Sequence, residues 1–582
     1  MTSDQYKLIT TAAELDESVA ALSRCRVIGA DTETTGLDPF TSRVRLLQLA
    51  TPDQVFIIDL FKVRALDHAG LRTLLTGDEP VKVLHNAKFD VKMLLHHFKL
   101  ETGGVFDTLL ASKLVAAGGD VGHGLAAVSD RHLGVEVDKS AQMSDWSGEI
   151  SEEQHRYAAK DAALMLPLHE KLSGDLERLG LNEVARIEFE CVLPLSALEL
   201  AGMSIDADCW KKQLEDVRRA HALTATALKS QLAAGVAQLS LFGEPDINLD
   251  SPAQVTEALA GMGIKLEGTR NWQLQPFAVR YPVIHLLLEY RALQKSLSSY
   301  GESMLSHVNP VTRRLHPDFH QIGATGGRMS CSDPNLQQVP NSPEYRSCFR
   351  AEPGRKLVIA DYSQIELRIL ADWSQDVALV KALVSGEDLH CVTASQMLGI
   401  KLEEVSKDQR AAAKQLNYGI MYGLGAQGLA NRIDCSIEQA EELLHKYFAT
   451  YSGVAAWLRE AANKAIGDHE SRTRSGRLIY FNFDANDRAQ VAAMQRLGKN
   501  SPIQGTSADM IKRALRLIYE GLRGIDAAIV NCIHDEIVVE SAETEAETCA
   551  AIVEREMIKA AREFIRSVPV SVDTAIASAW LK

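Results

Sequence analysis

The chain has 582 residues, enough for two to four domains, and its 46% hydrophobic content is ordinary for a globular protein. No apolar run approaches the roughly 20 residues that a membrane span requires, and the acidic N-terminus lacks an apolar core, so we expect no membrane segment, signal peptide or transit peptide. The net charge of −15 does not exclude nucleic-acid binding, because basic clusters at 346–356, 472–477 and 512–516 provide local surfaces for phosphates.

The nine cysteines are scattered singly, without Cys-x-x-Cys spacing. This distribution argues against a zinc site and against a disulfide framework, and it favours a reducing, cytoplasmic setting.

Residues 26–30 predict a strand that leads into Asp31 and Glu33. Side chains alternate along an extended chain, so both carboxylates point to one face. Two apolar runs, 44–50 and 55–60, are separated by a Thr-Pro-Asp turn and predict a small antiparallel sheet together with the first strand.

Three further side chains extend this acidic pattern. Asp90 follows a short strand at 81–84, and Tyr157 and Asp161 are four positions apart in a helical stretch, so they share a helix face. Two acids on a strand, a third acid and a helical Tyr-x-x-x-Asp resemble the DnaQ-like 3′–5′ exonucleases of the tyrosine subtype, a group similar to ribonuclease D. Taken singly, each acid is also compatible with an ordinary surface position.

The resemblance implies two metal ions bound by four carboxylates, those of Asp31, Glu33, Asp90 and Asp161. It also implies that Tyr157 positions or activates the water that attacks a single-stranded DNA 3′ end.

Residues 187–320 predict helices and no chemistry. Apolar spacing is helical at 187–200, 210–241 and 286–297, and Ser251 is placed to cap a helix that starts at Pro252. No constellation of titratable groups stands out, so we assign this region no site.

A buried strand is predicted at 357–360, where four apolar residues follow Pro353 and Gly354. Asp361 stands at the end of this strand, where it is held rigidly and can reach a cleft, a position that suits a metal ligand. Capping of the following helix is the alternative explanation for the same residue.

A helix that begins after Ser406 carries a row of functional side chains. Ser406 and Gln409 form a Ser-x-x-Gln capping box, and Gly423 and Gly425 supply a stop. Between them, cationic and aromatic residues recur every four positions, and the first three share one broad face: Arg410, Lys414, Tyr418 and Tyr422. Two cations and a ring on one face suit a triphosphate and a stacked base, although a solvated amphipathic helix has the same pattern.

Two adjacent acids mark the last motif. Apolar runs at 529–530 and 537–539 flank His534, Asp535 and Glu536, as in a hairpin with a polar tip. Turns favour Asn-Gly or Asp-Gly, so two acids here are better explained as oxygen ligands for divalent cations beside the carboxylate at the end of the 357–360 strand.

Three motifs in this order resemble those of family A DNA polymerases, the DNA polymerase I group: residues 361–366, 410–423 and 534–536. The implied fold class is α/β multidomain, with an RNase H-like (DnaQ-like) exonuclease domain at 1–185 followed by a right-hand polymerase domain at 186–582. Its expected parts are the thumb (190–310), the palm (311–375 and 505–582) and the fingers (376–504). The implied activity is DNA-templated addition of dNTPs to a primer 3′ end, with 3′–5′ proofreading.

The resemblance also implies roles for individual residues. Asp361 and Asp535 would ligate two Mg²⁺ ions, or Mn²⁺, with the Tyr362 backbone completing one shell, Glu536 supporting the site and Lys414 donating a proton to pyrophosphate. The implied nucleotide-binding set is Arg410, Lys414, Tyr418, Tyr422, Glu366, His390, Tyr362 and Gln364. Within this set, Glu366 would exclude a ribose 2′-hydroxyl, and a tyrosine at position 418 is associated with acceptance of dideoxynucleotides.

The implied DNA contacts are Arg328, Arg496, Asn500, Gln504 and His534. Gly326, close to the first of them, replaces the threonine of many relatives, which leaves the details of that contact open.

Two other functions remain open on the sequence alone. One is a ribonuclease-D-like exonuclease with a nucleic-acid-binding C-terminal module, and the other is a non-enzymatic protein that binds a primer-template and would tolerate loss of the acids. None of the acids is lost, which favours the enzyme. We expect a monomer with primer-template DNA and dNTPs as partners, and no flap removal, because the 5′-nuclease motifs of many relatives are not found.

Overall fold

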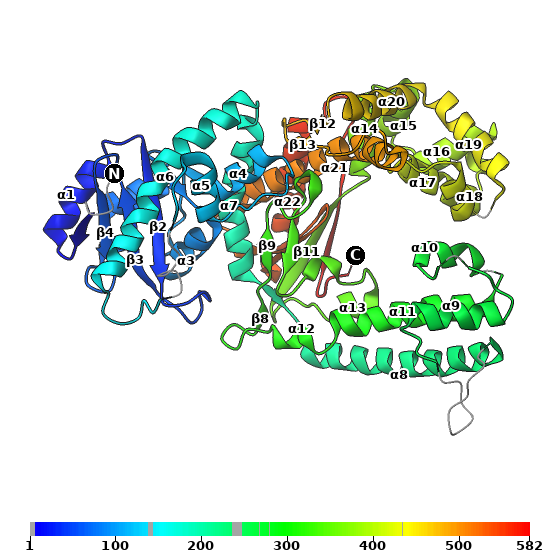
Figure 1. The fold of residues 1–582 in the computed structure, drawn as a ribbon, viewed down its shortest axis with the longest axis horizontal. Helices are drawn as coiled ribbons and strands as arrows, with labels where there is room; N and C mark the ends of the chain where they lie inside the picture. Colours follow the sequence, from blue (N-terminus) through cyan, green and yellow to red (C-terminus); the bar gives the residue numbers. More distant parts are fainter. Residues whose placement is uncertain are drawn as a thin grey trace.

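The computed structural model describes residues 6–137, 144–235, 247–266, 268–278, 280–433 and 435–581. A six-stranded sheet lies in the first part of the chain and a four-stranded sheet in the last, and helix α7 (Asn182–Ala201) contacts both parts (Figure 1). Within the described ranges, no helix is both long and apolar enough to cross a lipid bilayer.

The six-stranded sheet has the order β1-β4-β3-β2-β5-β6. Its strands are β1 (Tyr6–Ile9), β2 (Val27–Thr34), β3 (Val44–Ala50), β4 (Val55–Asp59), β5 (Val81–Leu84) and β6 (Val105–Asp107). The predicted antiparallel trio, β2 to β4, forms its centre, and β1, β5 and β6 each join in parallel. The strand predicted at 81–84 is confirmed as β5, but β1, β6 and the parallel pairings were not predicted, because pairing across connections of this length leaves no local signal.

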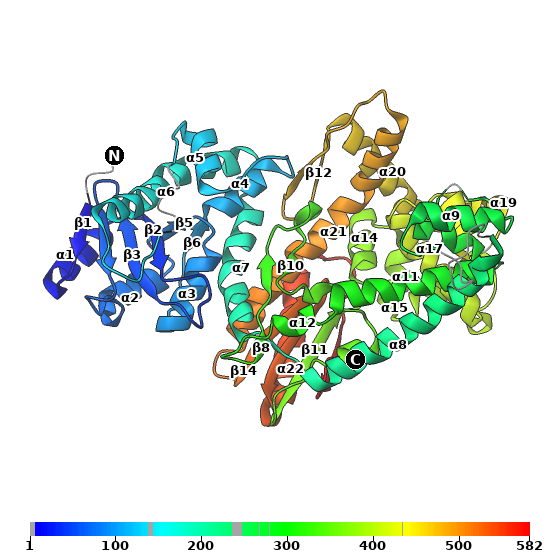
Figure 2. The same cartoon turned by 60° about the horizontal axis from the view of Figure 1, so that its bottom comes forward.

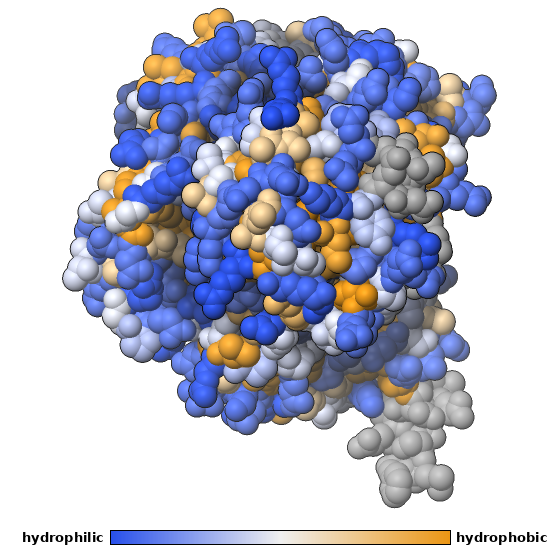
Figure 3. Space-filling view, turned by 90° about the vertical axis from the view of Figure 1, so that its left-hand side faces the viewer, coloured by the Kyte–Doolittle hydropathy of each residue, from blue (hydrophilic) through white to orange (hydrophobic). Residues whose placement is uncertain are grey.

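Helices surround this sheet: α1 (Ala12–Leu22), α2 (Ala69–Thr76), α3 (Lys88–Phe98), α4 (Thr108–Ala116), α5 (Leu125–Leu133) and α6 (Glu152–Arg178). Helix α6 packs across β2 to β5, so its inward side chains meet the end of β2. Seen from this end of the molecule, the surface is mostly hydrophilic, with separate small apolar areas (Figure 3).

The middle of the chain forms the helices α8 (Ala207–Leu232), α9 (Pro252–Gly261), α10 (Asn271–Leu274), α11 (Pro282–Tyr300) and α12 (Ser303–Ser306). Ser251 accepts a hydrogen bond from the Gln254 N–H and Pro252 is the first helical residue, as predicted. The predicted helix at 210–241 is confirmed as far as residue 232, and its last residues, 236–241, lie outside the described residues.

The four-stranded sheet is antiparallel throughout, with the order β14-β15-β11-β16. Its strands are β11 (Arg355–Tyr362), β14 (Ala527–Ile533), β15 (Glu536–Ala542) and β16 (Val572–Ala577). The apolar run at 357–360 is buried, as its sequence predicts, with α22 (Ala546–Phe564) packed against β11 and β16. The long helix α21 (Arg488–Gly521) packs against α22 and α7.

Helices α14 (Ile365–Ser374), α15 (Val377–Ser385), α16 (Leu389–Leu398), α17 (Lys407–Met421), α18 (Ala426–Ile433), α19 (Ile437–Thr450) and α20 (Ser452–Gly467) follow β11. The short hairpin β12 (Glu470–Arg472) and β13 (Leu478–Tyr480) then leads to α21. In Figure 1, α17 and α18 face α10 and α11, and both groups extend from the same side of the four-stranded sheet. Helix α8 packs along α11, and Figure 2 shows the two helices next to each other.

Short strands connect the groups: β7 (Met203–Ser204), β8 (Arg314–Leu315), β9 (Asp318–His320) and β10 (Ser330–Ser332), with helix α13 (Pro343–Arg346) before β11. The prediction against disulfides was wrong for one pair, because Cys209, in the first turn of α8, is bonded to Cys348, which follows α13. The two residues are 139 positions apart in sequence with Cα atoms 5.3 Å apart, so the pairing depends on the tertiary fold.

Candidate active sites

The end of β11 faces the hairpin turn between β14 and β15. Asp361 is opposite Glu536 in the sheet register, and the Tyr362 N–H donates to the Asp535 carbonyl at 3.3 Å. His534 has a φ of 54° in this turn. Burial, followed by the charge of Asp361, raises the pKa of Asp535 to about 7. The structure therefore brings the two predicted carboxylates, Asp361 and Asp535, together where the central strands β11 and β15 meet at one end of the sheet.

Glu536 is held by protein groups on both of its oxygens. Trp580 Nε1 donates to Oε1 at 2.7 Å, and Arg346 Nη1 lies 3.3 Å from Oε1 and 3.4 Å from Oε2. The Arg346 guanidinium also stacks over the Trp580 ring, 4.1 Å from its centroid. This arrangement fits a supporting carboxylate better than a free ligand.

The side chain of Tyr362 is turned away from the site. It is 2% exposed, and its hydroxyl donates to the Met557 carbonyl on α22 at 2.6 Å. Only its backbone remains available at the strand end, in agreement with a backbone role. Gln364 follows with a φ of 53° and caps α14.

Helix α17 begins at the predicted capping box, since Ser406 and Gln409 exchange hydrogen bonds. Arg410 and Lys414 are exposed on it, and Arg410 donates through Nε and Nη2 to Asp388 Oδ2 at 2.9 and 2.7 Å. Tyr418 is half-buried. Its pKa is raised by burial and then by the charges of three carboxylates, those of Glu366, Asp535 and Asp361. The helix therefore brings Tyr418 next to the strand-end carboxylates, whereas Arg410 pairs with Asp388.

A hydrogen-bonded chain crosses from α17 to α14 and α21. The Tyr422 hydroxyl donates to Glu366 Oε2 at 2.9 Å and also hydrogen-bonds Gln504. Burial raises the pKa of Glu366, although the hydrogen bond from Tyr422 and the nearby positive charge of Arg328 oppose the shift. Residues that are far apart in sequence thus meet beside Asp361.

A second acidic site lies at the end of β2, in a cavity of about 560 Å³. All five predicted residues line it: Asp31, Glu33, Asp90, Tyr157 and Asp161. Burial and the neighbouring acids raise the pKa of Glu33 to about 9 and place that of Asp31 well above its ordinary value. Burial also raises the pKa of Asp90 to about 7 and that of Asp161 to about 6.

Hydrogen bonds fix two of these acids. The Thr32 hydroxyl donates to Asp90 Oδ1 at 2.6 Å, and Tyr157 hydrogen-bonds Asp161. Burial and the charge of Asp161 raise the pKa of Tyr157, which keeps its hydroxyl protonated.

Among the described residues, no three His, Cys, Asp or Glu side chains are arranged, as they lie, to hold a metal ion together. The donor chemistry of the β2 site nevertheless fits divalent cations. Its four carboxylates face one cavity, and the charges of their neighbours raise the pKa of Asp31 and of Glu33, a repulsion that a cation relieves. Asp161 Oδ1 is also buried without a hydrogen-bond partner. The adjacent Asp361 and Asp535 have the same chemistry.

Comparison with known proteins identifies both halves. Residues 218–582 match DNA polymerase family A, and residues 6–177 match a 3′–5′ exonuclease domain. The chain belongs to DNA polymerase family A. It is a DNA polymerase with a 3′–5′ exonuclease domain, and domains of both kinds generally use divalent metals.

Relatives of this polymerase align along nearly its whole length. DNA polymerase I of Aquifex aeolicus is 32% identical, over 99% of this chain and 100% of the relative. DNA polymerase I of Pseudomonas aeruginosa is 30% identical over 99% of this chain, which spans 66% of that relative's length. The solved structure of the POL domain of Pol1 from M. smegmatis, in complex with DNA primer-template and dNTP, superposes with a TM-score of 0.85 at 27% identity, covering 98% of this chain and 99% of that one.

Three of the predicted DNA contacts lie beside the polymerase carboxylates: Gln504 hydrogen-bonds Tyr422, Arg328 is near Glu366, and His534 precedes Asp535 in the hairpin turn. Arg496, Asn500 and Gln504 follow one another along α21, and Arg328 is exposed. Burial, followed by the charge of Arg328, lowers the pKa of His534.

His390, a predicted nucleotide contact, is buried beside α17. The ring is 2% exposed, and its Nδ1 is 3.0 Å from Asn417 Nδ2 on α17. The structure records it as part of the packing between α16 and α17, 5.9 Å from the Tyr418 ring.

The three basic clusters were predicted to bind phosphates, and this interpretation is wrong for several of their members. Arg477 and Lys512 are buried in internal ion pairs, Arg346 contacts Glu536, and Arg474 contacts Asp372. A local run of basic residues does not reveal which side chains have acidic partners elsewhere in the fold.

Sequence reasoning missed three residues that shape the polymerase and exonuclease sites: Thr32, Arg346 and Trp580. Thr32 lies between two predicted ligands, so its position was a usable signal. The other two reach Glu536 from 190 and 44 residues away, and no sequence pattern marks them.

Proposed function

We propose that this polymerase extends a primer 3′ end on a DNA template at Asp361 and Asp535, and removes 3′-terminal nucleotides at the acidic cavity of β2. The observation that carries the polymerase assignment is the meeting of the strand-end carboxylates with Tyr418 of α17 and with Glu366, which Tyr422 hydrogen-bonds. The M. smegmatis relative, solved with primer-template and dNTP, supports DNA and dNTPs as the ligands.

In the polymerase site, Asp361, Asp535 and the Tyr362 carbonyl would hold two Mg²⁺ ions, for which Mn²⁺ is an alternative. Such ions, when bound, lower the pKa of the attacking hydroxyl and neutralise charge on the phosphates. Arg410 and Lys414 bind the triphosphate, and Lys414 donates a proton to the leaving pyrophosphate.

Other side chains select and orient the substrates. Glu366, held by Tyr422, excludes a ribose 2′-hydroxyl, and Tyr418 packs against the incoming nucleotide. Arg328, Arg496, Asn500, Gln504 and His534 contact the primer-template.

In the exonuclease site, the four carboxylates of the cavity would hold two further ions. Tyr157, protonated and hydrogen-bonded to Asp161, orients the attacking water toward the terminal phosphodiester.

The proposed division of the chain is an exonuclease domain at 1–185 and a polymerase domain at 186–582. Within the second, the proposed thumb is 190–310 with α8 to α12, the palm is 311–375 and 505–582 with the four-stranded sheet and α22, and the fingers are 376–504 with α15 to α20. We propose that the protein acts as an intracellular monomer.

One labelled primer-template tests both activities. The wild-type protein with Mg²⁺ should extend the primer when dNTPs are present and shorten it when they are absent. Asp535→Asn should abolish extension and keep shortening, whereas the double variant Asp31→Ala/Glu33→Ala should do the reverse, because each change removes ligands from one site only. EDTA should stop both reactions.

Shortening by the wild type at every dNTP concentration, without extension, would leave the ribonuclease-D-like exonuclease as the better explanation. The match of residues 218–582 to the polymerase family does not favour that outcome.

A further inference from the structure

Four charged side chains lie buried together where α7, α21 and the β12–β13 hairpin meet. Glu188, Asp509 and Lys512 are 0% exposed and Arg477 is 3% exposed. Lys512 Nζ and Arg477 Nη2 both contact Glu188 Oε1, and Arg477 donates to Asp509 Oδ1 through Nε at 2.8 Å and Nη2 at 2.6 Å. We call these four residues the buried cluster.

The buried cluster is balanced, with two acids and two bases. Burial disfavours the charged form of Glu188, but Lys512 and Arg477 outweigh it and hold the pKa of Glu188 below its ordinary value. Buried ion pairs add little net stability over apolar residues of the same size, and fixing one particular arrangement is a use that some proteins make of them. The contacts of the cluster with neighbouring residues indicate which part of the chain it holds in place.

Both ends of the segment 321–327 are attached to the buried cluster. Gln321 Nε2 donates to the Glu188 carbonyl at 2.9 Å and to Glu188 Oε2 at 2.8 Å. At the other end, Lys512 Nζ donates to the Gly327 carbonyl at 2.7 Å. The segment therefore depends on the cluster for its position.

Gly327 is in direct contact with the cluster. Its φ is 80°, and a Cβ atom on it would lie 2.4 Å from Arg477 Cζ. Only glycine combines this left-handed conformation with so close an approach. The backbone at Gly327 thus rests against the guanidinium.

Arg328 follows directly and reaches the polymerase site. Its side chain is exposed, and its charge acts on Glu366, Tyr422 and His534. The N–H groups of Gly323 and Ala324 donate to the Arg328 carbonyl, each at 3.1 Å, which closes the loop.

We propose that the buried cluster is a positioning device for Arg328, with Glu188 and Lys512 as positioning residues for the polymerase reaction. The cluster holds both ends of the 321–327 segment and so sets the point from which Arg328 extends to the primer end. This inference rests on the proposed polymerase function.

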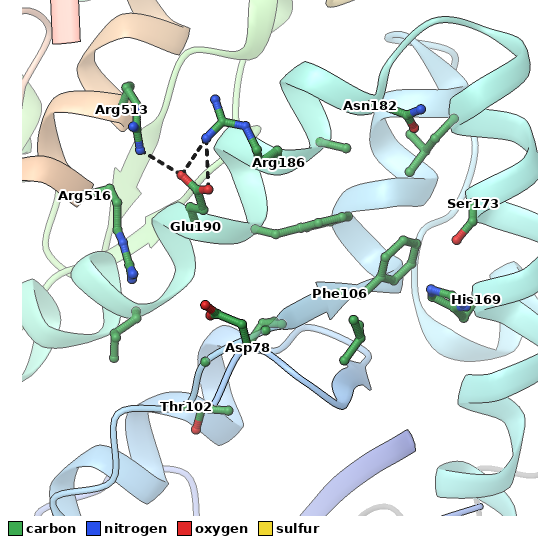
Figure 4. Close-up of a pocket in the computed structure, with 18 of the residues that line it drawn as sticks. Asp78, Thr102, Phe106, His169, Ser173, Asn182, Arg186, Glu190, Arg513 and Arg516 are labelled. Atoms are coloured by element: carbon green, nitrogen blue, oxygen red, sulfur yellow. Dashed lines mark hydrogen bonds and ion pairs between the residues drawn. The ribbon is translucent and has the colours of Figure 1, made fainter. Parts of the chain in front are cut away.

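The chain offers a matched control on the same two helices. Glu190 of α7 and Arg513 of α21 also form an ion pair, at 2.8 Å, one position along α21 from Lys512 and two along α7 from Glu188. Figure 4 shows this pair with Arg186 at the pocket between the two parts of the molecule. Within the described residues, Glu190 pairs with Arg186 and Arg513, and Arg513 pairs with Glu190 and Glu563, so none of these contacts reaches the 321–327 segment.

The test compares two charge-balanced double variants, Glu188→Gln/Lys512→Met and Glu190→Gln/Arg513→Met, each alone and combined with Arg328→Ala. Steady-state primer extension gives kcat and KM for the primer-template, and thermal unfolding verifies that each variant is folded. Degradation of a single-stranded 3′ end serves as the internal control, because the exonuclease cavity lies elsewhere.

We expect Glu188→Gln/Lys512→Met to lower kcat/KM for extension roughly tenfold, about as much as Arg328→Ala, with the control pair within about twofold of wild type. Combined with Arg328→Ala, the cluster variant should add less than about twofold, because it acts through a side chain that is already gone. Exonuclease rates should stay unchanged.

The inference would be overturned if the losses in kcat/KM from Glu188→Gln/Lys512→Met and from Arg328→Ala multiply in the combined variant. It would also be overturned if the control pair loses as much activity as the cluster variant. Either result would leave the proposed function intact. If Glu188→Gln/Lys512→Met does not fold, the neutral change Gln321→Met replaces it in the same cycle, with the same two outcomes. A wild-type protein that does not extend primers would overturn the proposed function and this inference with it.

Discussion

Trp580, two positions before the last residue of the sequence, illustrates how a single buried side chain orients a carboxylate in the polymerase site. Its indole N–H and the Arg346 guanidinium occupy both oxygens of Glu536, which is 8% exposed. A carboxylate held in this way keeps a fixed direction beside Asp361 and Asp535.

Trp580→Phe should lower the polymerase kcat about tenfold. The substitution removes one hydrogen bond to a charged group, worth about 1.5–3 kcal/mol, while Arg346 keeps part of the restraint on Glu536. Single-turnover primer extension measures the effect, and exonuclease activity should not change.

The control for this variant is Trp373→Phe, which also deletes an indole N–H. Trp373 Nε1 is buried and has no hydrogen-bond partner, so its loss should leave extension within about twofold of wild type. Equal losses in Trp580→Phe and Trp373→Phe would mean that the ring, not the bond to Glu536, is what matters.

At the scale of an element, helix α17 shows how fixed helix ends position a side chain in the polymerase site. The capping box fixes where the helix begins, and Gly423, with a φ of 71°, fixes where it ends. Between these points, the four-residue spacing places Tyr418 next to the strand-end carboxylates, where its hydroxyl lies in their field.

We expect Tyr418→Phe to increase discrimination against dideoxynucleotides by about tenfold to a hundredfold, the effect of one hydrogen bond of about 1.5–3 kcal/mol. The tyrosine hydroxyl can replace the 3′-hydroxyl that a dideoxynucleotide lacks, and phenylalanine cannot. Competition between dNTPs and ddNTPs in primer extension measures the ratio. Tyr447→Phe, which removes a buried hydroxyl without a partner on α19, is the control, and unchanged discrimination in Tyr418→Phe would refute the role of the hydroxyl.

Elements of this kind were predictable because their signals are local. The capping box of α17, the helix start at Pro252 and the hairpin at 534–536 are each encoded within a few residues, and the structure confirms all three. Helix spacing likewise placed Tyr157 and Asp161 on one face of α6, and both line the β2 cavity. Parallel pairing of β5 with β2 has no such local signal.

At the scale of the whole molecule, the contacts that hold the parts together were not predictable. Glu188 and Arg477 are 289 residues apart, and Cys209 and Cys348 are 139 apart. In sequence, buried lysines and arginines look the same as surface ones, which is why the basic clusters were misread. Only the tertiary fold shows that their charges are used internally.

The ion pairs that join the exonuclease and polymerase parts also connect residues that are far apart in sequence. Lys88, on α3 two residues before Asp90, donates to Glu199 on α7 and to Asp318 on β9, and Lys92 contacts Glu199 at 2.8 Å. Burial disfavours the charge of Lys88, but the two acids outweigh it and raise its pKa. The helix that carries an exonuclease carboxylate is thus anchored to the polymerase part by charged groups.

Lys88→Met should therefore destabilise the exonuclease part. Loss of one partner from a buried ion pair costs about 3–5 kcal/mol, but Glu199 keeps Lys92, so we expect about 2 kcal/mol and a fall in Tm of about 4–8 °C. Calorimetry should resolve this fall as a transition at lower temperature, separate from the rest. Lys99→Met, at the exposed end of the same helix, should shift Tm by less than about 1 °C, since the one hydrogen bond of its amine among the described residues is to the His96 carbonyl. Equal Tm values for the two variants would mean that apolar packing along α7, and not the lysine contacts, joins the two parts.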